Sequence, residues 1–303
     1  MHSTLHLGMK ETVQQLKHII SNGGPDTNDY SLLNYCIANL SEYIGSGLIG
    51  VDEIQPLLKS CDFLFDNRSI MGHIRMKPHG YAGDFEIIER IYEQGIREES
   101  YRKWDSFALA NPAAVAVRNR KQYFIDLLSS QLSERGQLKL CNVASGPGRD
   151  LFEMYKQIDS GLSLQTTCIE MDANAIAYAR KLTLNYRQHI NFIKKNILRF
   201  DSEEKFDLVW SAGLFDYFDD NTFIKLLSRF GGWLRPEGEI VIGNFNDEYN
   251  PSRAFMELFG DWKLKHRSED DLIRLACEAG YSERQLHIGR EPEAINLFLH
   301  IKS

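Results

Sequence analysis

A turn of small residues between an apolar run and a helix is the segment of this chain best suited to hold a ligand. Residues 138–151 read LKLCNVASGPGRDL, and the turn itself spans residues 144–148. Glycine lets the backbone approach a ligand closely, and a helix N-terminus presents N–H groups to it. The segment therefore predicts a binding site that includes Asn142, Ala144, Gly146 and Gly148.

The next apolar run ends in residues that could hold a sugar. Glu170 stands at its carboxyl end, where a carboxylate can accept hydrogen bonds from both hydroxyls of a ribose. Met171 follows directly and belongs to the same predicted site. We interpret Asp172 as the N-cap of the following helix. The spacing of about twenty residues after the glycine turn is the one that nucleotide sites use.

Residues at the carboxyl ends of two later apolar runs complete the predicted site. Asn196 could bind the edge of an adenine ring, with Ile197 packed against its face. The run after it ends in VWSAGLFDYF, which begins at Val209. Within it, Trp210 and Ser211 are placed in the crevice beyond the strand ends, where open α/β sheets bind ligands. For Phe215 and Phe218 in the same segment, core packing is the simpler interpretation.

These runs alternate with amphipathic helical stretches, which predicts a doubly wound, mostly parallel sheet. The expected strands are residues 138–143, 166–170, 190–194, 207–211 and 239–244, with a closing hairpin at 285–288 and 294–302. The expected helices between them are 151–157, 174–186, 221–234 and 269–279. The fold class is therefore α/β, a Rossmann-like sheet, and the part before it reads as helical.

In this order, the motifs resemble those of class I S-adenosylmethionine-dependent methyltransferases, from Leu138 to the C-terminus. The resemblance implies S-adenosylmethionine as the cofactor. Two positions depart from the family's first motif, Asp/Glu-x-Gly-x-Gly-x-Gly. Asn142 stands in place of the acid that helps to hold the ammonium group of the cofactor, and Ala144 in place of the first glycine. Losing the acid removes a charge that favours the protonated amine.

The N-terminal part adds a narrower resemblance. IRMKPHGYAGDFEII, from Ile74, and AVAVRNRKQYF, from Ala114, resemble bacterial proteins for the biosynthesis of extracellular factor 3-hydroxypalmitic acid methyl ester. This implies a helical region, residues 1–130, that covers the active site of a cofactor domain, residues 131–303. Polar residues expected near the site are Tyr81, Asp84, Arg118 and Arg120. The arginines could pair with a carboxylate. His73 and His79 fit a surface or lid-packing role better than a catalytic one.

Three functions remain open at this stage. The first is methyl transfer to the carboxylate of a small molecule or fatty acid, which needs alignment but no general base. The second is attack of the cofactor's own amine on its Cγ, which gives azetidine-2-carboxylic acid, as in azetidine-2-carboxylate synthases of this fold. Asn142 would keep that amine neutral, Ser211 and Tyr81 would orient it, and Trp210 would support the sulfonium. The third is a non-catalytic sensor of S-adenosylmethionine or a partner-binding protein, with the helical N-terminal half as an interaction module.

The composition of the chain limits the classes of partner that it could bind. A formal net charge of −7 without a long basic run argues against a nucleic-acid binder. No apolar run approaches the ~18 residues of a membrane helix, and MHSTLHLGMK at the start lacks the apolar core of a signal peptide. The five scattered cysteines suit a reducing cytoplasm and predict no metal site. We expect a cytoplasmic enzyme with a small-molecule substrate, and a homodimer is compatible with the sequence.

Overall fold

The computed structural model describes residues 2–303, with side chains from Gly8 onward. Part of the N-terminal segment that we tested for a signal peptide therefore lies outside the described side chains. The chain divides into two compact units. We call the first the helical unit, which comprises the residues up to Val115 together with Pro251–Lys263. The second, the sheet unit, comprises Ala116–Asn250 and Leu264–Ser303.

The helical unit consists of α-helices joined by short 3-10 turns, and the described part of it contains no strand. Two of its helices begin at side chains that cap them: Ser69 caps α4 and Asp84 caps α5 by accepting N–H groups of the first turn. The helices are α1 (His2–Ser21), α2 (Tyr30–Gly45), α3 (Val51–Lys59), α4 (Ile70–Met76), α5 (Phe85–Glu93), α6 (Arg102–Ala110) and α11 (Arg253–Leu258). No described helix is long and apolar enough to cross a membrane.

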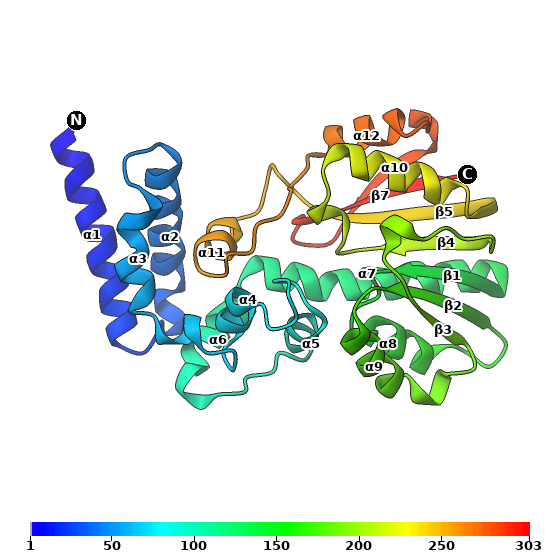
Figure 1. The fold of residues 1–303 in the computed structure, drawn as a ribbon, viewed down its shortest axis with the longest axis horizontal. Coiled ribbons are helices and arrows are strands. Elements are labelled where there is room, and N and C mark those ends of the chain that lie inside the picture. Colours follow the sequence, from blue (N-terminus) through cyan, green and yellow to red (C-terminus); the bar gives the residue numbers. More distant parts are fainter. Residues whose placement is uncertain (1) are drawn as a thin grey trace. The chain divides into compact units, whose positions relative to one another are not determined.

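The sheet unit is built on seven strands in the order β3-β2-β1-β4-β5-β7-β6 (Figure 1). The first five pair in parallel, and β7 pairs antiparallel with both β5 and β6. The strands are β1 (Gln137–Val143), β2 (Ser163–Glu170), β3 (Ile190–Lys194), β4 (Phe206–Ser211), β5 (Leu234–Phe245), β6 (Leu286–Arg290) and β7 (Asn296–Lys302). This mixed sheet is typical of class I methyltransferases, so the predicted fold class and the closing hairpin are confirmed.

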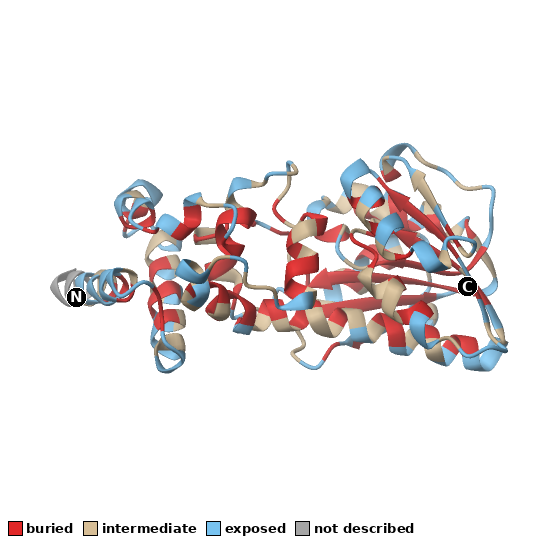
Figure 2. Cartoon of the chain, turned by 90° about the horizontal axis from the view of Figure 1, so that it is seen from below, coloured by how far each residue is buried: buried red, intermediate tan, exposed pale blue. Residues whose placement is uncertain are grey.

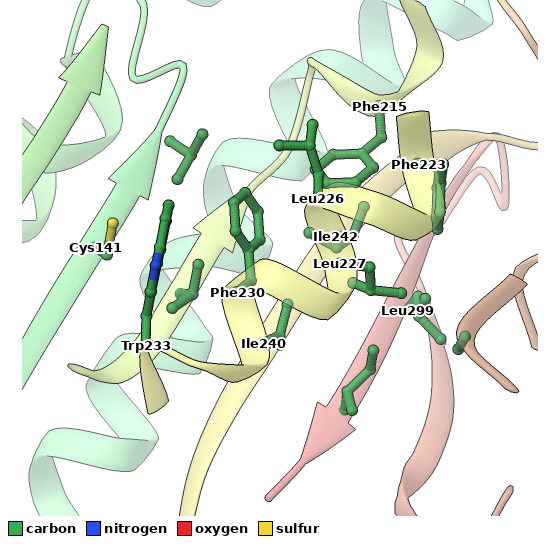
Figure 3. Close-up of a cluster of buried hydrophobic side chains, with 14 of the residues drawn as sticks. Cys141, Phe215, Phe223, Leu226, Leu227, Phe230, Trp233, Ile240, Ile242 and Leu299 are labelled. Atoms are coloured by element: carbon green, nitrogen blue, oxygen red, sulfur yellow. The ribbon is translucent and has the colours of Figure 1, made fainter. Parts of the chain in front are cut away.

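Helices cover both faces of this sheet. On one face, α10 (Asp220–Gly231) packs against the strands through a core that includes Phe223 and Phe230 (Figure 3). Helix α12 (Glu269–Glu278) adds Leu272 to the same core. On the other, α7 (Pro112–Arg135) and α8 (Arg149–Gln157) pack through a core that includes Phe124 and Leu151. The central strands β1 and β4 are buried along most of their length, as parallel strands between helix layers must be (Figure 2). Helix α9 (Ala173–Leu182) follows β2.

The structure moves several expected boundaries, of which two matter most for the organisation of the chain. Strand β5 starts at Leu234 rather than 239, because Leu234 already pairs with Phe206 before a register shift in the ladder. The two units meet in sequence inside α7, between residues 115 and 116, rather than at residue 130. The reason is that Phe124 and Leu128 of this helix belong to the core beneath the sheet. Whether the helical unit covers the active site remains a prediction.

Candidate active site

The glycine turn follows β1 at the point where the strand order reverses. Strand β1 has β2 on one side and β4 on the other, and both pairings are parallel. In open α/β sheets, ligands bind at this switch point, beyond the carboxyl ends of the strands. The predicted residues at the ends of β1, β2, β3 and β4 therefore share one edge of the sheet unit, as expected.

Three residues of the turn have left-handed backbone, with φ of 55° at Ala144, 54° at Gly146 and 70° at Gly148. A Cβ on Gly148 would lie 3.1 Å from the Cβ of Ala179. Glycine there lets the start of α8 approach α9, which is the packing role of a glycine in such turns. A Cβ on Gly146 would have no atom within 4 Å. The turn therefore has open space above Gly146, where a ligand could approach the backbone.

Ala144 carries a side chain at a backbone conformation that glycine prefers. Left-handed backbone costs an L-residue about 1–2 kcal/mol, and extra freedom of glycine in the unfolded chain offsets part of the gain. We expect Ala144→Gly to raise the free energy of unfolding in urea by about 0.5–1 kcal/mol. The matched control is Ala177→Gly on the exposed side of α9, which should lower it by about 1 kcal/mol. A lower free energy of unfolding in both variants would contradict backbone strain at Ala144.

Glu170 ends β2 and binds the glycine turn. Its Oε2 accepts the N–H of Gly146 at 3.0 Å, and its Oε1 accepts the N–H groups of Met171 at 2.7 Å and Asp172 at 2.9 Å. Burial raises the pKa of this carboxyl, and the three N–H groups oppose the rise. A carboxylate has about four acceptor positions. The contacts therefore pre-orient the group and leave acceptor capacity on Oε2 for a ribose hydroxyl.

Asn142 is the predicted site residue with an unmet bonding requirement. Its side chain is 2% exposed, and its Nδ2 has no hydrogen-bond partner among the described residues. An unpaired buried donor costs about 1–3 kcal/mol, so an acceptor atom of a bound molecule would satisfy it. S-adenosylmethionine carries such acceptors in its carboxylate and ribose. The residues present therefore fit this cofactor.

The two residues predicted at the end of β4 behave differently. Ser211 is fully buried, and its hydroxyl donates to the carbonyl of Val143 at 3.2 Å, which links the tips of β4 and β1. Trp210 points to the face covered by α7, where its ring stacks with Phe298 at 5.6 Å and lies near Phe124. The alternation of side chains along a strand commits this ring to the core. The structure therefore does not support the predicted contact of Trp210 with the sulfonium.

The predicted adenine site is outlined by apolar residues at the ends of β2 and β3. Met171 is 59% exposed and Leu198 is 45% exposed, although both are large and apolar. Ile197 is buried in the core below them. The Oδ1 of Asn196 accepts the N–H of Leu198 at 2.9 Å. Its carbonyl is therefore engaged in a cap, and the hydrogen bond predicted toward adenine would come from its NH₂ group.

A cluster of buried charged side chains lies at the same edge, and the sequence predicted only its arginine. Arg120 of α7 donates from Nη1 to the carbonyl of Ala212, in the loop after β4, at 3.0 Å. Burial raises the pKa of Asp216 to about 6, against hydrogen bonding from Phe245 and the charge of Arg120. Burial likewise raises the pKa of Asp150 to about 6. The two aspartates were missed because nothing in the sequence pairs them with a residue of α7. Arg118, two residues before Arg120 in the sequence, is also in the sheet unit.

The other predicted residues lie in the helical unit. Tyr81 and Asp84 are in the segment between α4 and α5, and their approach to the cofactor remains a prediction. His73 is buried rather than on the surface, and it bonds to Asp84. Phe215 is fully buried in the core against α10, which confirms its packing role (Figure 3).

Residues 141–238 match a family model described as a methyltransferase domain. No curated protein sequence matches the chain at a significant level. Among solved structures, a possible exported protein of Bordetella parapertussis is similar over 99% of this chain and 96% of its own, with a TM-score of 0.63 and 18% identity. At that identity the similarity shows a shared fold.

Two further structures share the fold over part of their length. A proposed O-methyltransferase of Nostoc punctiforme has a TM-score of 0.50 and 15% identity, over 63% of this chain and 58% of its own. The S-adenosylmethionine-dependent methyltransferase SibL has a TM-score of 0.50 and 14% identity, over 71% of this chain and 61% of its own. This chain thus spans less than two thirds of either protein.

The family match runs from β1 into β5 and lies wholly in the sheet unit. It includes the glycine turn, Glu170, Asn196 and the end of β4, which are the places where the geometry puts the site. Sequence, topology and family model agree on the kind of domain. Residues 141–238 therefore form an S-adenosylmethionine-dependent methyltransferase domain.

Proposed function

We propose that the chain transfers the methyl group of S-adenosylmethionine to the carboxylate of a small molecule or fatty acid. The bound cofactor supplies a methyl group that is already activated as an electrophile by the sulfonium. The chain then has to hold the cofactor, exclude water and align an acceptor oxygen in line with the methyl. The turn of residues 144–148 and Glu170 would hold the cofactor, and Asn142 would donate to one of its acceptor atoms.

The state of the carboxylates at this edge supports an acceptor that needs no deprotonation. Glu170 accepts three backbone N–H groups, Asp216 accepts the N–H of Phe245, and Asp150 accepts that of Leu151. Burial raises the pKa values of Asp150 and Asp216 to about 6, but these hydrogen bonds hold each carboxylate against the backbone, so we assign none of the three as a general base. An acceptor that is already an anion avoids the requirement. This is the observation that carries the carboxylate proposal.

Cations in the sheet unit suit an acidic acceptor. Arg120 is buried beside the loop after β4, and Arg118 is half-buried on the same helix. Burial lowers the pKa of Arg118, yet a guanidinium stays charged at neutral pH. A guanidinium can also bind a carboxylate with two hydrogen bonds. We assign Arg118 to the carboxylate of the acceptor or of the cofactor.

Asn142 favours a second function, cyclisation of the cofactor to azetidine-2-carboxylic acid with loss of methylthioadenosine. That reaction needs a neutral amine as the nucleophile. An uncharged amide at the tip of β1 does not stabilise an ammonium, whereas a carboxylate there would. In this scheme the hydroxyl of Ser211, which lies at the neighbouring tip of β4, would help to orient the amine.

Product analysis by mass spectrometry separates these functions. The purified chain is incubated with S-adenosylmethionine alone, and then with a panel of fatty acids, hydroxy acids and matched amines and alcohols. Our proposal expects S-adenosylhomocysteine and a methyl ester only when a carboxylic acid is present. Methylthioadenosine with azetidine-2-carboxylic acid from the cofactor alone would replace it with the cyclase. Methylation confined to amines or alcohols would refute the carboxylate acceptor.

Restoring an acid at the tip of β1 tests the role of Asn142. We expect Asn142→Asp to leave methyl transfer within a fewfold of wild type, because a carboxylate there favours only the ammonium form of the cofactor. A cyclase would instead lose at least tenfold in rate. The matched control is Asn191→Asp, at an exposed position of β3, which should change neither reaction. The rates are measured at saturating cofactor, so that they report the reaction rather than binding.

A further inference from the structure

A cluster of two histidines and one aspartate in the helical unit takes no part in the proposed reaction. Among the described residues, His73, His79 and Asp84 form a group whose ligand atoms all lie within 4.8 Å of one another. His73 and Asp84 are buried, while the side chain of His79 is 20% exposed. The expectation of no metal site rested on the spacing of the cysteines, which bears only on thiolate ligands.

The local fold brings the three residues together. His73 lies on α4, and the chain reverses after this helix through Lys77, whose backbone is left-handed with φ of 51°. His79 stands on the following turn. Asp84 caps α5, and its Oδ1 accepts the N–H groups of Glu86 and Ile87. Two helix ends and the turn between them therefore each contribute one side chain.

The group already has most of the geometry of a coordination site. The Nε2 of His73 lies 2.8 Å from Oδ2 of Asp84, and the two imidazole centres are 6.1 Å apart. Two ligand atoms on a tetrahedral ion with bonds of about 2.1 Å lie about 3.4 Å apart. Closing the group from 4.8 Å onto an ion therefore needs a shift of about 1 Å. Gly80, next to His79, would have no atom within 4 Å of a Cβ, so the turn has room to move.

Neighbouring charges also suit a cation. The Nε2 of His79 lies 3.1 Å from Oε2 of Glu86, and a carboxylate in this position commonly orients a metal-binding imidazole. Arg97 compensates the charge of Glu86, and Asp84 supplies the remaining negative charge.

We propose that His73, His79 and Asp84 bind a divalent transition-metal ion such as Zn²⁺. Two imidazoles and one carboxylate are a donor set that Zn²⁺ and Fe²⁺ accept, with further positions left for water. The ion would replace the proton shared between His73 and Asp84. It would also join the end of α4, the turn and the start of α5, so its first effect is on the stability of the helical unit.

Titration of the full chain with the metal alone tests the site. The protein is freed of metal with a chelator and dialysed, and ZnCl₂ is added in a calorimeter. We expect one saturable site per chain and a rise in the thermal unfolding midpoint with Zn²⁺, since an ion that binds only the folded state stabilises it. Co²⁺ in place of Zn²⁺ should give the intense visible bands of a site with four or five ligands.

His79→Ala is the main variant, because His79 is half-buried on a turn and its loss should leave the fold intact. We expect at least tenfold weaker binding and loss of the Co²⁺ bands. His287→Ala, an exposed histidine of β6, is the matched control and should bind as wild type. A His2→Ala/His6→Ala variant should do the same. No saturable binding, binding unchanged in His79→Ala, or binding lost in either control would overturn the proposal.

Discussion

Replacing Glu170 with alanine should weaken the binding of S-adenosylmethionine by tenfold or more. A hydrogen bond to a charged group is worth about 1.5–3 kcal/mol, and 1.4 kcal/mol corresponds to tenfold in affinity. The variant would lose the acceptor for the ribose. It would also release the N–H of Gly146, which Glu170 holds at 3.0 Å, so the turn would lose its orientation. Calorimetric titration of the cofactor measures the effect.

Asp172→Ala is the matched control for Glu170→Ala. Its carboxylate lies two residues further on and caps α9 by accepting the N–H of Asn174 at 2.7 Å. Losing a cap costs about 1 kcal/mol of stability, with little effect on cofactor affinity. Both variants should therefore unfold more easily in urea, and only Glu170→Ala should bind weakly. Wild-type affinity in Glu170→Ala would remove this residue from the site.

Replacing Gly72 with alanine should destabilise the helical unit by at least about 2 kcal/mol. A Cβ at Gly72 would lie 2.1 Å from the carbonyl oxygen of Asp66 and 2.4 Å from that of Phe63. Both contacts are with backbone, so no side-chain rotation relieves them. Alanine gains at most about 1 kcal/mol over glycine in a helix, which cannot offset the clash. Denaturant unfolding followed by fluorescence reports the loss, since Trp104 lies in this unit.

Gly95→Ala is the matched control for Gly72→Ala. Gly95 follows α5 in the same unit, has no left-handed backbone, and has no atom within 4 Å of the position of a Cβ. Alanine there should leave the unfolding free energy unchanged or raise it slightly, because it restricts the unfolded chain. If Gly72→Ala proved as stable as Gly95→Ala, the packing of α4 on the 63–66 segment would be wrong.

The sheet could be predicted because its signal is local. Buried parallel strands read as short apolar runs, and five of them follow one another with helices between. The extra length of β5 could not be predicted, because its first residues read as a turn and pair only through the register shift opposite Phe206. The boundary between the two units within α7 could not be predicted for a similar reason. Periodicity shows that a helix exists but not which partner its apolar face contacts.

The site residues divide in the same way. Glu170 and the glycine turn were found because strand ends meet at one edge of a parallel sheet, a property that sequence order reveals. The prediction for Trp210 was wrong because neighbouring side chains at a strand end point to opposite faces of the sheet. Only the packing of the sheet shows which of the two faces a given side chain occupies. Asp216 and the pairing of His73 with Asp84 depend on contacts between segments, which no spacing in the sequence signals.

A crystal structure of the chain with S-adenosylhomocysteine would test the central claim most directly. We predict that the ribose hydroxyls lie within hydrogen-bond distance of Glu170, and that an acceptor atom of the ligand accepts from Nδ2 of Asn142. The ligand should pass over the backbone of Gly146, where the structure leaves open space. A ligand bound elsewhere, or one that leaves both Glu170 and Asn142 untouched, would contradict the assignment of this edge as the cofactor site.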